Sequence, residues 1–164
     1  MKNDIELINF TELTLEEKKM VLEWRNHPDI RKWMYNQNEI KLTDHLNFIE
    51  NLKNRKDKLY FLVKQDNKYI GVIDFYDIDK YECKAGLYKN PFEHLLGYGK
   101  ILLKSCIDYA FNILKVEKLK LEVFKENEKA KRLYKKFNFK ETEEKIINNQ
   151  KVICMELKNE NRKP

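Results

Sequence analysis

The chain has 164 residues, of which 42% are hydrophobic, and its 33 basic and 27 acidic side chains give a formal net charge of +6. This length suffices for one domain with a hydrophobic core, so we expect a single domain over residues 1–158 and a polar C-terminal tail over 159–164. No apolar run approaches the roughly 20 residues of a membrane span and no signal-peptide region opens the chain, which indicates a cytoplasmic protein without a membrane partner.

The first third of the chain is predicted to be mainly helical after one strand. Thr14 and Glu17 have the spacing of a capping box and mark the start of a helix. Pro28 then interrupts the pattern, and Thr43 is expected to cap a further helix. The expected strand and three helices span residues 5–10, 15–24, 29–35 and about 43–54.

From residue 59 the apolar pattern alternates, as in strands, and helices return later. The pairs Asp66-Asn67 and Asn148-Asn149 tolerate the left-handed backbone of tight hairpins. The expected strands are 59–65, 68–76, 81–88, 118–124, 139–147 and 151–157, with helices at 97–114 and 127–137. This order predicts an α+β fold, in which helices cover both faces of a mixed, mostly antiparallel sheet of about seven strands.

A glycine-bearing loop at 91–99 runs directly into the helix that starts near residue 97. Gly97 and Gly99 lack a Cβ, and the helix start offers unpaired N–H groups, so an anion is a natural ligand there. Plain turn glycines are the alternative. His94 and Ile101 exclude a Walker P-loop, and Leu102 excludes a dinucleotide fingerprint.

The loop resembles the Q/R-x-x-G-x-G/A pyrophosphate loop of the GCN5-related N-acetyltransferases, the GNAT family. His94 stands where that family usually has Gln or Arg. The resemblance implies acetyl-CoA as co-substrate and no metal. By the same resemblance, the cofactor-binding residues are Leu87, Tyr88 and Lys89 on the preceding strand, then His94, Leu95, Leu96, Gly97, Tyr98, Gly99 and Lys100. His94 packed on the helix start is the alternative to a binding role.

Residues 121–139, LEVFKENEKAKRLYKKFNF, resemble the strand–Asn–helix–Tyr segment of the same family. Asn127 matches the asparagine that bonds the coenzyme's amide region, although a simple helix cap explains it equally well. Tyr134 matches the general acid that protonates the departing thiolate. A phenol of pKa about 10 and a thiol of about 8.5 are close enough for such a transfer. A tyrosine that only packs the helix on the sheet is the alternative.

An amine must lose a proton before it attacks a thioester, and Glu122 resembles the strand glutamate used as base by ribosomal-protein N-acetyltransferases. Its neighbours Leu121 and Val123 should face the other side of the strand. A solvent-facing glutamate is the alternative. A backbone N–H near residues 87–89 would stabilise the oxyanion, as in the family.

The sequence shows no residue pattern for catalysis by a cysteine nucleophile or by a bound metal ion. Cys83, Cys106 and Cys154 have no paired spacing and are expected to be buried free thiols. The three histidines are isolated, which leaves no metal-binding pattern. The dispersed basic charges favour small anionic ligands over nucleic acid.

The stretch 22–36 and His45 resemble the nucleotide-sugar N-acetyltransferases of pseudaminic acid biosynthesis, most clearly in W-R-N and I-R-K-W-M-Y. The resemblance implies that the acceptor is the 4-amine of UDP-4-amino-4,6-dideoxy-N-acetyl-β-L-altrosamine. The implied substrate-binding residues are Arg25, Arg31, Trp33, Met34, Tyr35 and His45. Alternatively, the tryptophans anchor the core and the arginines pair with Asp29 or Glu23.

Two other functions remain open for this sequence. One is acetylation of a protein α-amine by the same fold, and the other is a non-catalytic acyl-CoA-binding domain. The presence of Tyr134 and Glu122 favours an enzyme. A monomer or a homodimer is expected.

Overall fold

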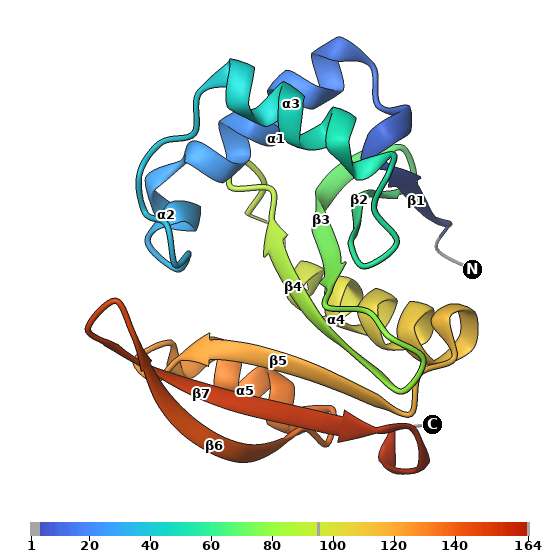
Figure 1. Cartoon of the computed structure of the whole chain (residues 1–164), viewed down its shortest axis with the longest axis vertical. Helices are drawn as coiled ribbons and strands as arrows, with labels where there is room; N and C mark the ends of the chain where they lie inside the picture. Colours follow the sequence, from blue (N-terminus) through green and yellow to red (C-terminus); the bar gives the residue numbers. More distant parts are fainter. Residues whose placement is uncertain (1–3, 95, 164) are drawn as a thin grey trace.

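The computed structural model describes residues 4–94 and 96–163. Within them, seven strands form one sheet in the order β1-β2-β3-β4-β5-β7-β6 (Figure 1). The strands are β1 (Ile5–Asn9), β2 (Leu59–Gln65), β3 (Lys68–Tyr76), β4 (Glu82–Lys89), β5 (Lys118–Phe124), β6 (Lys140–Ile147) and β7 (Gln150–Lys158). Neighbouring strands pair antiparallel except β4 and β5, which are parallel. The predicted α+β class and mixed sheet are confirmed.

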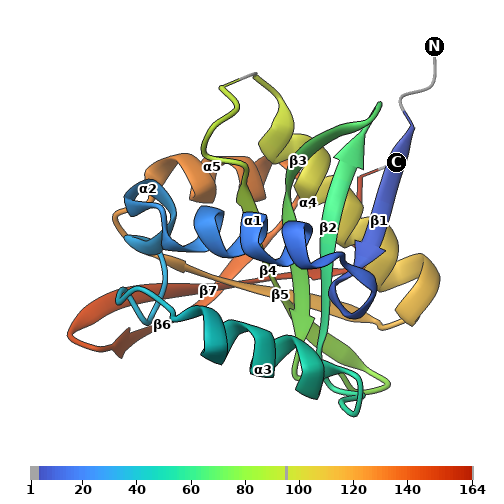
Figure 2. The ribbon, with the colours of Figure 1, turned by 90° about the horizontal axis from the view of Figure 1, so that it is seen from above.

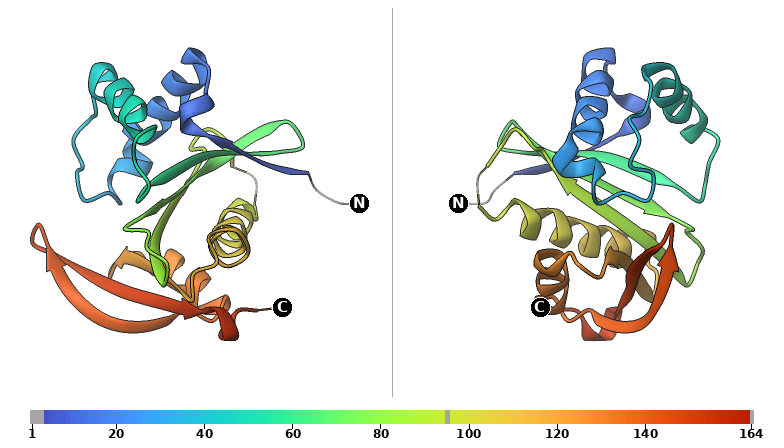
Figure 3. Two further views of the ribbon diagram at one scale, coloured as in Figure 1. Left: turned by 45° about the vertical axis from the view of Figure 1, so that its right-hand side comes forward. Right: turned by 90° about the vertical axis from the view of Figure 1, so that its left-hand side faces the viewer.

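Helices cover both faces of this sheet, α1 and α3 on one side and α4 and α5 on the other (Figures 2 and 3). The α-helices are α1 (Leu15–Asn26), α2 (Pro28–Arg31), α3 (Leu42–Leu52), α4 (Tyr98–Asp108) and α5 (Glu128–Lys136). No helix in the described part of the chain is long and apolar enough to cross a bilayer.

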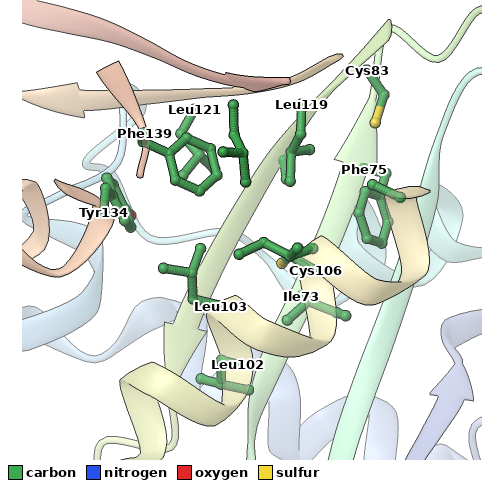
Figure 4. Close-up of a cluster of buried hydrophobic side chains, with 14 of the residues drawn as sticks. Ile73, Phe75, Cys83, Leu102, Leu103, Cys106, Leu119, Leu121, Tyr134 and Phe139 are labelled. Atoms are coloured by element: carbon green, nitrogen blue, oxygen red, sulfur yellow. The ribbon is translucent and has the colours of Figure 1, made fainter. Parts of the chain in front are cut away.

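Each face of the sheet has its own hydrophobic core, because side chains alternate along the strands. On β2 and β3, Phe61 and Ile73 face α4, whereas Leu62 and Val72 face α1 and α3. Figure 4 shows the larger core, where α4 lies against β3, β4 and β5 and α5 contributes Tyr134.

Several local predictions are confirmed. Thr14 and Glu17 form the predicted capping box, with each side chain bonded to the other's backbone N–H. The two hairpin turns also form as predicted, with φ of 49° and 70° at Asp66 and Asn67 and the same left-handed backbone at 148–149.

Other element boundaries differ from the prediction. Thr43 caps nothing, because α3 already begins at Leu42, after Lys41. Pro28 breaks the helical pattern as predicted, since α1 ends at Asn26, and it also opens the short α2, because the first helical position needs no N–H donor. The long predicted helix at 97–114 divides into α4 and a π-helical turn (Tyr109–Leu114).

Part of the predicted tail packs on the domain. Asn159–Asn161 form a 3₁₀ turn, and the Asn161 carbonyl accepts a 3.0 Å hydrogen bond from the Asn138 side chain. The Arg162 guanidinium lies 5.6 Å from the centre of the Phe111 ring.

Candidate functional site

The parallel strands β4 and β5 diverge in the middle of the sheet. They pair from Glu82↔Lys118 to Ala85↔Leu121 and no further. Beyond this point β4 stays paired with β3, and β5 stays paired with β7. We call this divergence the fork (Figure 1). On its β5 side, β4 therefore presents backbone groups over residues 86–89 that pair with no other strand of the described chain.

The glycine-bearing loop follows β4 and leads into α4 at the fork. Gly97 is the N-cap of α4, with φ at 94° and no side-chain cap, so first-turn N–H groups of α4 lack a side-chain acceptor. A Cβ at residue 97 would meet no atom within 4 Å, so this glycine is needed for its backbone conformation. A Cβ at Gly99 would lie 3.4 Å from Leu133, an ordinary contact against α5.

The predicted loop residues differ in exposure. His94 is exposed rather than packed on the helix start, and Leu96 is 98% exposed. Lys100 is also exposed, whereas the Tyr98 side chain is buried in the core and leaves only its backbone for a ligand. Leu95 lies outside the described residues.

Two lysines meet at the open end of the fork. Lys89 ends β4, and burial together with the nearby charge of Lys129 lowers the pKa of Lys89. Lys129 belongs to the first turn of α5. Two cations that face each other in this way form a suitable site for an anionic group.

Asn127 and Tyr134 are both positioned by α5. The Asn127 carbonyl oxygen caps the helix by accepting a 3.3 Å bond from the Ala130 N–H, so its cap role is observed and its amide nitrogen stays available. Tyr134 is buried, with its ring centre 6.0 Å from that of Phe139 (Figure 4). Burial, then the nearby Cys106, raises the pKa of Tyr134, so its phenol is protonated at neutral pH.

Glu122 follows the fork on β5, on the face away from α4, as predicted. Its carboxylate accepts hydrogen bonds from Tyr35 Oη at 2.5 Å and Lys145 Nζ at 2.8 Å, and Lys84 Nζ lies 3.3 Å away. Burial alone would raise the pKa of Glu122, but these hydrogen bonds and charges outweigh it and lower that pKa. Glu122 is therefore an ionised, fully engaged carboxylate.

The segment that contains α2 reaches across to the other half of the sheet. We call residues 27–36 the arm. The rings of Trp33 and Tyr35 lie 6.3 and 5.8 Å from that of Phe124 in β5. The Tyr35 carbonyl also accepts a 3.2 Å bond from Asn148 at the tip of the β6–β7 hairpin (Figure 1). The arm thus bridges the fork.

Among the predicted substrate-binding residues, Arg25 has a buried hydrogen-bond donor without a partner in the described chain. Its Nη2 donates to the Asn36 carbonyl at 3.0 Å, whereas its buried Nη1 has no partner among the described residues. Burial lowers the pKa of Arg25, and Tyr60 and Tyr88 lie nearby. An unpaired buried donor is costly, so an acceptor from a ligand would stabilise it.

The remaining predicted acceptor residues are dispersed. Arg31 lies 3.8 Å from Glu39 rather than pairing with Asp29 or Glu23, and Met34 is half-buried. Trp24 is the core anchor, whereas Trp33 is 39% exposed. His45 is buried between α3 and α1, where its Nε2 lies 2.8 Å from the Lys18 carbonyl. The structure thus gives His45 a helix-packing contact instead of a place beside the arm.

The sequence interpretation missed several residues on the same face of the sheet. Lys84, Phe124 and Lys145 surround Glu122, and Asp74 on β3 lies beside the fork. The signal for Asp74 was present, since a carboxylate interrupts the apolar run KYIGVIDFY. Which partners surround it depends on strand register, which the sequence did not reveal.

The cysteines do not form a reactive centre. All three are free, and burial raises the pKa of Cys83 to about 12 and that of Cys106 well above its usual value. Within residues 4–94 and 96–163, no group of three His, Cys, Asp or Glu side chains is placed to hold a metal ion.

Comparison with known proteins gives a consistent result. The profile of the acetyltransferase (GNAT) family matches residues 19–139. The acetyltransferase PseH of Campylobacter jejuni is 47% identical over 135 residues, which cover 82% of this chain and 84% of that protein.

Solved structures agree with this sequence similarity. The crystal structure of Campylobacter jejuni N-acetyltransferase PseH in complex with acetyl coenzyme A has a TM-score of 0.78 and 39% identity, and covers 94% of this chain and 99% of that one. Spermidine N-acetyltransferase from Vibrio cholerae, in complex with CoA and spermine, reaches a TM-score of 0.86 at 20% identity over 96% of each chain, a likeness of fold alone.

Proposed function

Since this chain belongs to the acetyltransferase (GNAT) family, we propose that it acetylates the 4-amine of a UDP-linked 4-amino-4,6-dideoxy sugar in pseudaminic acid biosynthesis. The chain is an acetyl-CoA-dependent N-acetyltransferase. The sugar and the roles of individual residues are our proposal.

The fork and the Gly97 cap together carry the cofactor assignment. The free backbone of β4 at residues 86–89 can pair with the amides of an extended pantetheine arm, as a neighbouring strand would. First-turn N–H groups of α4 then suit the pyrophosphate. Lys89 and Lys129 add positive charge at the same end, which an anionic cofactor would neutralise.

Tyr134 supplies the proton for the departing thiolate in this proposal. Its phenol is protonated at neutral pH, and its burial excludes bulk water from the transfer. A β4 backbone N–H near residues 87–89 would stabilise the negative charge that develops on the thioester oxygen. Asn127 would bond the coenzyme's amide region through its free amide nitrogen.

The acceptor enters from the other side, between the arm and the face of the sheet that carries Glu122. The unpaired Nη1 of Arg25 suits a phosphate or carbonyl oxygen of the nucleotide sugar. Trp33 and Phe124 offer apolar area for a sugar methyl group or a uracil face. Tyr35, held on Glu122, closes this side of the site.

An acetyl-transfer assay with a panel of amines tests the acceptor. Purified protein is incubated with acetyl-CoA and, separately, a UDP-4-amino-4,6-dideoxy sugar, a peptide with a free N-terminus, or spermidine, and free thiol and acetylated product are measured. We expect the nucleotide sugar to be preferred in kcat/KM by at least about 100-fold, because a buried unpaired arginine donor discriminates against amines without an acceptor for it. Faster acetylation of the peptide would overturn this acceptor class.

A further inference from the structure

We propose that Asp74, rather than Glu122, takes the proton from the ammonium group of the acceptor. This inference rests on the proposed function, since it assigns the base of that same reaction. It departs from the expectation that Glu122 is the base.

Asp74 lies beside the point where the fork opens. Its register partner on β4 is Gly86, the first β4 residue beyond the last pair with β5, and strands lie about 4.8 Å apart. A Cβ at residue 86 would be 2.8 Å from Asp74 Oδ1. The missing side chain of Gly86 therefore lets the Asp74 carboxylate lie across β4, toward the fork.

The Asp74 carboxylate is unpaired. Within residues 4–94 and 96–163, no side chain donates a hydrogen bond to it and no cation lies within ion-pair distance. Burial raises the pKa of Asp74 to about 7, and the charge of Lys58 opposes this only in part. Free lone pairs and a pKa near neutrality are what a general base requires.

Glu122 lacks both properties. Lys145, Lys84 and Tyr35 all engage its carboxylate, and its pKa lies below the ordinary value. Two carboxylates thus face the same site with their pKa values pushed in opposite directions, the arrangement that separates a proton acceptor from a fixed charge. We assign Glu122 to hold Tyr35, Lys84 and Lys145 in place.

The other titratable groups on this face do not compete as bases. They include Arg25 of α1, Tyr35 of the arm, Tyr60 of β2, Tyr76 of β3, Lys84 and Tyr88 of β4, Glu122 of β5, Lys145 of β6 and Cys154 of β7. Burial raises the pKa of each of the four tyrosines and of Cys154, so these groups remain protonated at neutral pH. The Arg25 guanidinium has no acceptor lone pair, and Lys84 and Lys145 are both engaged by Glu122. Asp74 remains as the group that can change charge near pH 7.

The ammonium gives one proton to Asp74, and the freed nitrogen lone pair forms the C–N bond to the acetyl carbon. The C–S bond breaks, and the sulfur takes the Tyr134 proton. The nitrogen then loses a second proton to the Tyr134 phenolate, which restores the phenol. The products are an amide and a free thiol, and the protonated Asp74 later releases its proton to water.

Asp74→Asn tests the role, because it keeps the size of the side chain and removes its basicity. We expect kcat at pH 7 to fall by roughly 100-fold or more, with calorimetric acetyl-CoA affinity within twofold of the wild type. Asp108→Asn, on the exposed surface of α4, is the matched control and should retain full kcat. Asp74→Glu should recover part of the lost kcat. A kcat within threefold of the wild type in folded Asp74→Asn would overturn the role.

The pH profile of kcat for the wild type gives a second, independent measurement. A base must be deprotonated, so kcat should rise with pH through about 7 and then level off. Glu122→Gln should keep this rise of kcat with pH, whatever the substitution does to KM. If kcat of the wild type rose with pH around a midpoint at or below pH 5, the assignment would be contradicted even if Asp74→Asn did not fold. Should the wild type prefer a peptide amine, the proposed acceptor would fail while both tests of Asp74 remain valid, since that ammonium must lose a proton too.

Discussion

At the scale of single residues, burial and hydrogen-bond partners assign the reactive roles more clearly than residue type does. Glu122 and Asp74 are both carboxylates at the fork, yet three side chains engage the first and none engages the second within the described chain. Tyr134 packs in the core and keeps its proton because its pKa is raised, so packing is compatible with the proton-donating role that we propose for it. The two interpretations of Tyr134 from the sequence are therefore compatible.

Tyr134→Phe separates the packing role of Tyr134 from its proton. Phenylalanine keeps the ring against Phe139, so we expect unchanged thermal stability within about 1 kcal/mol, a kcat lowered by roughly 100-fold and an unchanged affinity for acetyl-CoA. Steady-state kinetics and calorimetry measure these effects. Tyr109→Phe, which removes a hydroxyl group from the same core, is the control and should keep full turnover. An unchanged kcat in Tyr134→Phe would remove this residue from the mechanism.

At the scale of elements, the start of α4 depends on one backbone conformation. Gly97 has φ at 94°, which an L-residue with a branched side chain rarely adopts, although there is room for a side chain. The loop match with the GNAT family placed glycine here, and the structure adds the reason. Asn138 makes a similar left-handed stop after α5, with φ at 73°.

Gly97→Val should weaken acetyl-CoA binding without unfolding the protein. The strain of about 1–2 kcal/mol at a positive φ is relieved when the loop turns its N–H groups away, so we expect the Kd to rise by at least about tenfold. Isothermal titration calorimetry measures this change. Asn138→Ala is the control, because it places a comparable strain after the C-terminal end of α5, away from the start of α4. It should lower the stability of the protein but leave the Kd for acetyl-CoA unchanged. Equal losses of affinity in both variants would mean that the effect is general destabilisation.

At the scale of the whole molecule, the arm ties the two halves of the sheet together across the fork. The single residue Tyr35 makes three of these links, since it contacts Glu122, Phe124 and the tip of the β6–β7 hairpin. Burial, then the hydrogen bond to Glu122, raises the pKa of Tyr35, so this link persists through neutral pH. The arm touches the loop before α4 only through its first residue in the contacts described, where the His27 ring centre lies 5.3 Å from that of Phe92, whereas Tyr35 lies at the other end of the arm beside β5, so a change at Tyr35 should act on the acceptor side.

Tyr35→Phe should therefore affect the acceptor alone. It removes one partly exposed hydrogen bond to a carboxylate, worth roughly 1 kcal/mol, so we expect the acceptor KM to rise about fivefold and the acetyl-CoA KM to stay unchanged. Initial rates with each substrate varied in turn give both constants. Tyr81→Phe, at an exposed tyrosine outside the arm, should leave both constants unchanged. A rise in the acetyl-CoA KM alone would contradict the placement of the arm on the acceptor side.

The sequence by itself determined the elements and the family resemblance, because capping boxes, Asx-rich hairpin turns and alternating strands are set by neighbours close in the chain. It also located the glycine-bearing loop before α4 and the position of Tyr134 on α5, since each lies within one continuous segment. The tertiary structure alone placed Asp74 over Gly86, tied Glu122 to Lys84 and Lys145, and buried His45 against Lys18. Charge states depend on burial and on partners from distant segments, and strand register decides which of these meet.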